Sequence, residues 1–284
     1  MNKASLIANI LNQATHNNAA YRTGSELLPE GTKRAGGWRI GEFARFGHVE
    51  MLRIRFARLK AASESESITE EECGREDADL AAASGFLEVL QELRRHNIHC
   101  SAQRGAANAA RNGHLEVIQD LRAHGIDCSI PGANVAASRG HLQIVRDLLA
   151  HGIRCTAQGA NRAAQFGHLE VLRELRAHGV RCTSDGANGA AMSGHLHVIR
   201  DLRENGVHCT SSGANKAAAK GHLEVVRDLR AHGVHCILIG ANAAAQNGCL
   251  EMVRDLQTHG VSFTEWGAND AAGNGHLDVV RELR

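Results

Sequence analysis

The sequence predicts an all-α solenoid of about eight to nine stacked helix-turn-helix units joined by short loops. Three observations indicate this fold. A Gly-His-Leu motif recurs at a constant step, each step contains two amphipathic helical stretches, and aromatic residues make up only 3% of the chain. One compact core needs larger side chains than this, whereas thin helices stacked in a row can pack with small ones.

The recurring glycine sets the length of the unit. Its members follow one another at a constant interval: Gly113, Gly140, Gly167, Gly194, Gly221, Gly248 and Gly275. The interval from Gly85 to Gly113 is longer by a single residue, which is added between Ser101 and Arg104. The interval from Gly47 to Gly85 is longer still, and the extra residues lie in 61–72, which are polar and acidic. This segment is predicted to be an insert loop.

The first helix of each unit is predicted to bury a face of alanine. In one unit the alanines are three and four residues apart and share one side of a helix: Ala133, Ala136 and Ala137. The opposite side is expected to be exposed and carries Val135, Ser138 and Arg139. Gly140 follows and is predicted to end this helix in the left-handed conformation.

The second helix is predicted to bury larger side chains. Its apolar stripe in the same unit consists of Leu142, Ile144, Val145 and Leu148. Gly152 ends it, and Asn97 takes that place in an earlier unit. Residues 153–155 then alternate between apolar and polar, which indicates a short extended link. One unit cannot bury its own stripe, so the units must stack.

The chain divides into a terminal segment and a repeat array. Residues 1–36 do not fit the repeat and are predicted to be an N-terminal capping segment, with a helix over 4–13. Residues 37–284 form the array, which stops at Arg284 inside the expected last helix without a polar cap; we expect a truncated or an unusual end.

Neither a membrane span of roughly 20 apolar residues nor a secretory signal is recognisable, which favours the cytoplasm and reduced thiols.

The charges of the chain are balanced. It has 32 basic and 31 acidic residues, for a formal net charge of +1. This balance argues against nucleic acid or an anionic membrane as the main partner.

Cysteine forms a column with one member per unit: Cys73, Cys100, Cys128, Cys155, Cys182, Cys209 and Cys236. A metal or redox ladder is one interpretation, and a small buried apolar residue is the other. Helix layers lie roughly 9–10 Å apart, whereas a disulfide needs Cα atoms about 4.4–6.8 Å apart and zinc needs sulfur at about 2.3 Å. We therefore expect a structural column, with no metal and no cofactor.

Histidine and asparagine also recur once per unit. One histidine opens the second helix, as His141 does, and its ring can bond backbone groups of the adjacent turn. Another, such as His151, lies at the C-terminus of that helix, where the helix dipole favours its protonated form. Both are expected to be structural, with pH sensing as the alternative. The asparagine column, which includes Asn188, is predicted to be a hydrogen-bonding rung between units.

The outward face of the second helices carries mixed charge, for example Arg173, Asp201 and Asp228. Such a pattern is typical of a solvated face with weak ion pairs. The glycines do not form a Gly-x-Gly-x-x-Gly phosphate loop, and we recognise no Ser-His-Asp or paired-carboxylate arrangement at a unique place. No catalytic residue is predicted, and the chain is expected not to be an enzyme.

Residues 217–233 read Ala-Ala-Ala-Lys-Gly-His-Leu-Glu-Val-Val-Arg-Asp-Leu-Arg-Ala-His-Gly, and this pattern resembles ankyrin repeats over roughly 39–284. Ankyrin repeats run to about 33 residues, and their helix opens with Thr-Pro-Leu-His. In this chain the repeat is shorter than an ankyrin repeat, as the interval from Gly194 to Gly221 shows. Its first helix opens with Gly213–Asn215 where ankyrin repeats have Thr-Pro-Leu-His. The missing residues correspond to the projecting hairpin of the family, so we expect short loops. The resemblance implies a monomeric scaffold or adaptor that binds a protein partner.

Binding positions are free to vary between units, and the variable positions gather on the exposed side of the first helix. We predict that a partner binds Asn108, Arg111, Val135, Arg139, Arg162, Phe166, Met192, Lys216, Lys220, Asn247, Trp266, Asp270 and Asn274. The loops are expected to extend this surface with Ile130, Gln158, Asp185, Ile239 and Trp266. The alternatives are neutral drift on a solvated face, a bacterial effector that binds a host protein, or a nucleic-acid-binding solenoid.

Overall fold

The computed structural model describes residues 40–62 and 73–284. Over these residues the chain forms nine helix pairs and no strand, which confirms the predicted all-α solenoid. The first helices are α3 (Ile40–Arg45), α5 (Arg75–Ser84), α7 (Ala107–Asn112), α9 (Ile130–Ser138), α11 (Ala157–Gln165), α13 (Ser184–Met192), α15 (Ser211–Ala219), α17 (Leu238–Gln246) and α19 (Glu265–Gly273). The second helices are α4 (Val49–Ala62), α6 (Leu87–Arg95), α8 (Leu115–Ala123), α10 (Leu142–Ala150), α12 (Leu169–Ala177), α14 (Leu196–Glu204), α16 (Leu223–Ala231), α18 (Leu250–Thr258) and α20 (Leu277–Glu282).

Two predicted boundaries involve residues at the edge of the described chain. The predicted capping segment, 1–36, lies outside the described residues. The predicted insert loop was placed at 61–72, but Ala61 and Ala62 belong to α4, so that boundary is wrong by two residues. The rest of that segment, 63–72, lies outside the described residues.

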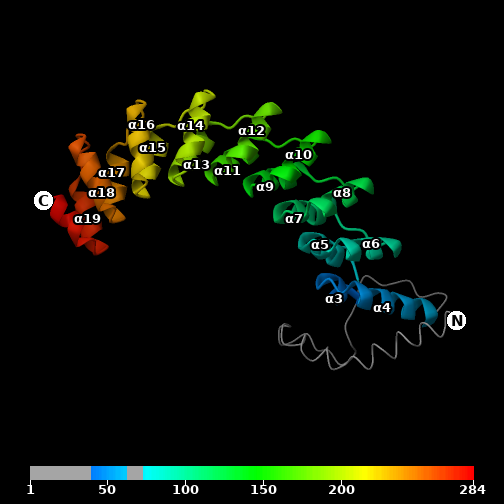
Figure 1. The fold of residues 1–284 in the computed structure, drawn as a ribbon. Helices are drawn as coiled ribbons and strands as arrows, with labels where there is room; N and C mark the ends of the chain where they lie inside the picture. The colour runs from blue at the N-terminus through cyan, green and yellow to red at the C-terminus, as the bar shows by residue number, and fades with distance from the viewer. Residues whose placement is uncertain (1–39, 63–72) are drawn as a thin grey trace.

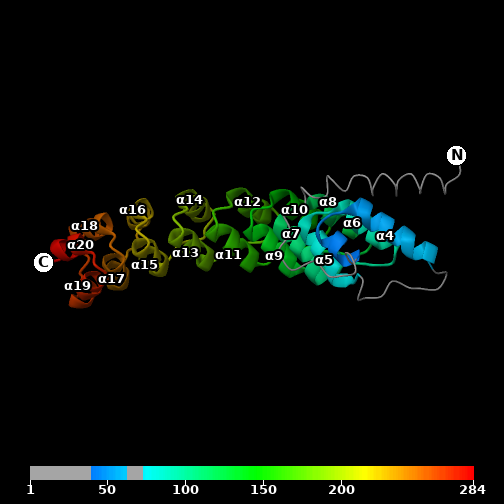
Figure 2. The ribbon, with the colours of Figure 1, turned by 90° about the horizontal axis from the view of Figure 1, so that it is seen from below.

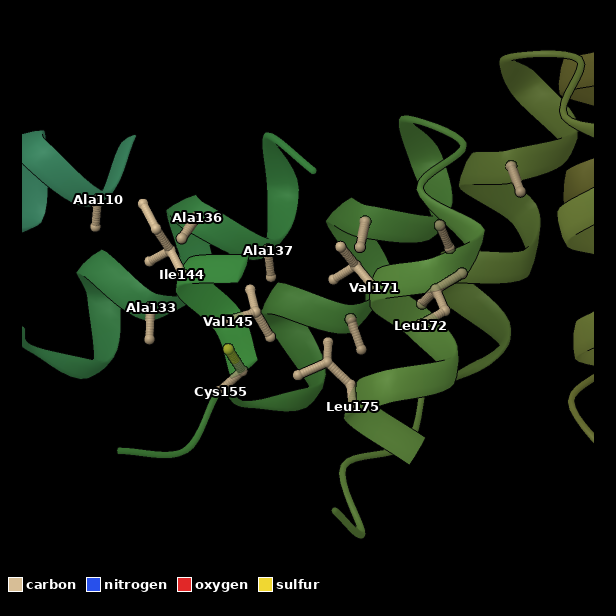
Figure 3. Packing of buried hydrophobic residues seen from close by; sticks show 14 of the residues in the cluster. Ala110, Ala133, Ala136, Ala137, Ile144, Val145, Cys155, Val171, Leu172 and Leu175 are labelled. Carbon is tan, nitrogen blue, oxygen red and sulfur yellow. The ribbon is translucent and has the colours of Figure 1, made fainter. Parts of the chain in front are cut away.

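The first helices pack closely because their buried faces carry alanine and glycine. Ala133, Ala136 and Ala137 are fully buried, as predicted, and they belong to the same buried cluster as Ile144 and Val145 of the second helix (Figure 3). A Cβ atom added at Gly213 would lie only 3.1 Å from the Cα of Asn188 in the preceding first helix. Larger side chains at these positions would push neighbouring first helices apart.

The difference in side-chain size between the two rows accounts for the curvature of the array. The first helices line the inner side of an arc and the second helices its outer side (Figure 1). The second helices are held apart by valine, leucine and isoleucine, whereas the first helices meet through alanine and glycine. In the view turned by 90° the array runs nearly straight, so the curvature lies mainly in one plane (Figure 2).

The helix ends follow the predicted glycine and asparagine signals. Gly140 and Gly152 have φ values of 78° and 81°, and Asn97 has a φ of 61°, so all three are left-handed. The residue added after Ser101 is absorbed by a π-helical turn, η2 (Ala102–Ala106), which leads into α7. A π-turn accommodates one extra residue without breaking the helix, and this keeps the longer unit in register.

Candidate functional site

The asparagine column joins neighbouring repeats, as predicted. Asn188 Nδ2 donates to Thr210 Oγ1 at 3.0 Å, and Asn188 Oδ1 accepts from the Thr210 backbone N–H at 2.9 Å. The same pair of bonds links Asn134 to Thr156. These asparagines fasten the start of one first helix to the preceding one, so they belong to the scaffold.

The first histidine column also joins repeats, but its partner differs from the expected one. The ring of His141 bonds the carbonyl oxygen of Arg111 at 2.8 Å, and His222 bonds that of Met192 at 3.0 Å. The partner is therefore the end of the preceding first helix and not the adjacent turn. Burial lowers the pKa of His168 and of His195 below the ordinary value, which favours the neutral ring in these inter-repeat bonds.

The second histidine column caps the second helices. His151 Nδ1 lies 2.7 Å from the carbonyl oxygen of Asp147, one turn earlier, and His259 has the same relation to Asp255. Asn205 replaces histidine in one repeat and donates from Nδ2 to the Asp201 carbonyl at 2.7 Å. Because an asparagine amide forms the same bond to the helix end, this column acts as a structural cap that does not require a protonated imidazole.

The charged face of the second helices is an ordered ladder of ion pairs. Asp201 accepts from Arg173 Nε at 3.0 Å and from Arg176 Nη1 at 2.8 Å, and both arginines belong to the preceding second helix. The Asp201 side chain is only 9% exposed. The prediction of a solvated face with weak ion pairs is therefore wrong for this carboxylate. The same holds for Asp228, which binds Arg200 and Arg203.

The pKa of Asp201 reflects this environment. Burial alone would raise it, but the hydrogen bonds from Arg176 and Arg173 outweigh burial and lower the pKa below the ordinary value. The carboxylate is thus charged at neutral pH and holds two arginines of the preceding repeat.

The thiols of the cysteine column are buried and weakly reactive. All seven members are buried, and burial raises the pKa of Cys155 to about 12 and that of Cys182 to about 11. Because the thiolate is the reactive form, these thiols are poor nucleophiles and poor metal ligands near neutral pH. In residues 40–62 and 73–284, no group of three or more His, Cys, Asp or Glu side chains is arranged to hold a metal ion.

The predicted binding residues lie on the first helices or directly after their last residue, on the inner side of the arc. The exposed members are Arg111, Arg139, Arg162, Phe166, Lys216, Lys220, Asn247, Trp266, Asp270 and Asn274, and the half-buried members are Asn108, Val135 and Met192. The exposed fraction is 50% for Phe166 and 77% for Trp266. We call this set the concave face.

Two predicted members of the concave face also hold the scaffold together. Asn247 Nδ2 donates to the Ala219 carbonyl at 2.9 Å, and Asn274 Nδ2 donates to the Gln246 carbonyl at 2.9 Å. Ser138, expected on the exposed side, is instead buried and bonds the carbonyl of Val135. The Asn247 and Asn274 side chains are thus directed into the preceding repeat, whereas the Ser138 bond stays within its own helix.

The positions expected in loops are helical. Ile130, Gln158, Asp185, Ile239 and Trp266 all lie in the first turn of a first helix. They therefore extend the concave face toward the N-terminal ends of its helices. Sequence reasoning missed Ile237 and Leu238, which are 46% and 42% exposed. The available signal was an apolar triplet at 237–239, where the preceding repeat carries threonine and serine.

Two of the three comparisons with known proteins gave no match. No protein-family model matches the chain, and a search of curated proteins found no match. Among solved structures, the chain is similar to the ankyrin repeat domain of human ASB11, with 20% sequence identity and a TM-score of 0.46. The similarity covers 53% of this chain and 81% of that one. The helix pairs described above make the described part of the chain an all-helical repeat array.

None of the described helices has the length and apolar character needed to cross a membrane.

Proposed function

We propose that this chain is an interaction scaffold that binds a protein partner on its concave face. One observation carries the proposal. Side chains that join repeats recur from unit to unit, as Asn188 and His222 illustrate. One first-helix position, in contrast, holds a different residue in each of the units that carry Val135, Arg162 and Lys216. A surface that is not needed for stacking and that changes along a rigid array can be specific for one partner.

The chemistry of the concave face supports binding to a protein. Arg162 lies on α11, and Phe166, four residues later, directly follows the last residue of that helix. Lys216 and Lys220 have the same arrangement at α15. Residues four apart share one side of a helix, so each helix presents two adjacent side chains. Arginine and large aromatic residues are enriched among those that dominate binding energy at protein interfaces. Exposed Trp266 on α19 adds a second aromatic anchor.

Affinity capture from cell lysate, followed by mass spectrometry, tests this proposal. The test variant carries Arg162→Ala, Phe166→Ala, Lys216→Ala and Lys220→Ala. A matched control carries Glu88→Ala, Glu116→Ala and Gln143→Ala, three exposed positions on the second helices. We expect a partner that is retained by the wild type and by the control but lost by the test variant, with an unchanged helical circular dichroism spectrum. A partner that all three proteins retain would place the site elsewhere, and no protein partner at all would overturn the scaffold proposal.

A further inference from the structure

Basic residues on the two sides of the array differ in whether they form ion pairs. On the second helices, Arg173, Arg200 and Arg227 each pair with an aspartate of the next repeat. On the concave face, five exposed cations have no ion pair and no side-chain hydrogen bond in the described part of the chain: Arg111, Arg139, Arg162, Lys216 and Lys220. Stacking of the repeats therefore does not account for these five charges.

Acidic residues are almost absent from the same stretch. The first helices from α7 to α15 contain one acid, Asp185, which lies on α13. The aspartates of the second helices in this stretch are bound to arginines there: Asp120, Asp147, Asp201 and Asp228. The inner side between α7 and α15 thus carries a local excess of positive charge, although the whole chain has a net charge of only +1.

We propose that the concave face binds an acidic polypeptide segment in an extended conformation. This inference rests on the proposed function and adds the chemistry of the partner. Four helix-to-helix steps of about 9–10 Å separate α7 from α15, so the five cations span roughly 40 Å. An extended chain rises about 3.3 Å per residue, so about twelve residues cover that distance. Carboxylates at the matching spacing would meet cations that have no partner within the chain.

A polypeptide suits this surface better than a nucleic acid. Asp185 is exposed between the repeats that carry Arg162 and Lys216. A nucleic acid has a phosphate at every nucleotide and would place negative charge against this carboxylate, whereas a polypeptide can place a neutral or basic residue there. Half-buried Val135 and Met192 and exposed Phe166 supply apolar contacts between the charges, as at protein interfaces.

Fluorescence anisotropy with defined probes tests the inference. The acidic probe is a labelled peptide of the length given above that contains glutamate, serine and glycine. A second peptide has glutamine in place of glutamate, and the third probe is a single-stranded oligothymidylate. We expect the full chain to bind the acidic peptide at least about tenfold more tightly than the other two probes, with affinity that falls as salt is added.

Two variants locate the binding site. Arg139→Glu, Arg162→Glu, Lys216→Glu and Lys220→Glu together should weaken binding of the acidic peptide by at least about tenfold. Arg154→Glu and Arg181→Glu are the matched control, because both are exposed cations in the links between repeats and lack an ion pair among the described residues. This control should retain most of the affinity. Because the altered side chains are exposed, both variants should keep the wild-type helical spectrum and thermal midpoint.

Several results would overturn the inference. They are equal binding of the glutamine peptide, equal binding by the four-site variant, or tighter binding of the oligothymidylate, which would indicate a nucleic-acid site. If no probe binds while affinity capture still finds a protein on the concave face, the scaffold proposal stands and acidity of the partner is wrong. If capture also fails, both proposals fall.

Discussion

Four asparagines of the Gly-Ala-Asn motif use both ends of the amide on the following repeat: Asn134, Asn161, Asn188 and Asn242. The glycine of the next motif makes this possible, because a Cβ atom at Gly213 would clash with Asn188 Oδ1. The two residues therefore act together: one removes a side chain and the other bonds the backbone that approaches. The same place in α5 is taken by Asp79, which accepts from both the N–H and the hydroxyl of Ser101.

Replacement of Asn188 by alanine should destabilise the array. The change leaves the Thr210 N–H and hydroxyl without their partner, and a lost hydrogen bond of this kind costs about 1–3 kcal/mol. Urea denaturation followed by circular dichroism should show a lower free energy of unfolding by that amount. Ser212→Ala, at an exposed position in the same region, is the control and should have little effect. Equal stability of Asn188→Ala and the wild type would remove the amide from the inter-repeat scaffold.

At the scale of elements, neighbouring second helices are joined by arginines that converge on one carboxylate. Arg227 and Arg230 both donate to Asp255, at 2.8 Å and 2.7 Å, and this carboxylate is 5% exposed. The pairs follow the repeat, so each second helix donates to the next along the array. Charge-assisted bonds of this geometry are stronger than isolated surface pairs.

The ladder predicts loss of stability in acid. The folded pKa of Asp201 lies below the ordinary value of 3.8, so the unfolded chain binds more protons between these two values. The stabilisation is complete above about pH 4 and disappears as the pH falls through the folded pKa. Asp201→Asn should reduce stability at neutral pH by about 2 kcal/mol and flatten the decline in acid. Glu170→Gln, in an exposed pair, is the control. A wild-type profile that stays flat from neutral pH to about pH 3 would contradict this account.

At the scale of the whole molecule, the array is held together by contacts between neighbours. Substantial contacts join the two helices of a pair or adjacent pairs, and the arc keeps distant pairs apart (Figure 1). Stability of such an array is approximately a sum of repeat terms and nearest-neighbour interface terms. A weakened central interface should therefore separate the chain into two units.

Gly213→Ala tests this view, because its methyl group would meet the backbone of Asn188 across the α13–α15 interface. Overpacking of this kind costs about 1–3 kcal/mol. Hydrogen exchange with mass spectrometry should show the helices on either side of that interface opening at different denaturant concentrations, whereas the wild type opens more cooperatively. Gly273→Ala places its methyl group in open space and should leave the exchange pattern unchanged. A uniform loss of protection in Gly213→Ala would argue against nearest-neighbour coupling.

The sequence by itself determined the length of the repeat, the two helices of each unit, their buried faces and the residues that end them. These features depend on the spacing of residues within one helix and on the conformational freedom of residues such as Gly140. Both are local properties of the chain. The variable, exposed positions Arg162, Phe166 and Lys216 were also predictable, since they lie opposite a recurring alanine face.

Only the tertiary structure decided which residues meet across repeats. Asp201 and Asn247 looked solvated in the sequence, but their partners lie 25 to 28 residues away, and whether side chain and partner meet depends on how one helix pair is placed against the next. The curvature and the unpaired state of the concave cations have the same origin. Side-chain size in two helix rows sets the rotation between repeats, and that rotation brings charges together on the second helices while Arg139 and Lys220 remain exposed without partners among the described residues.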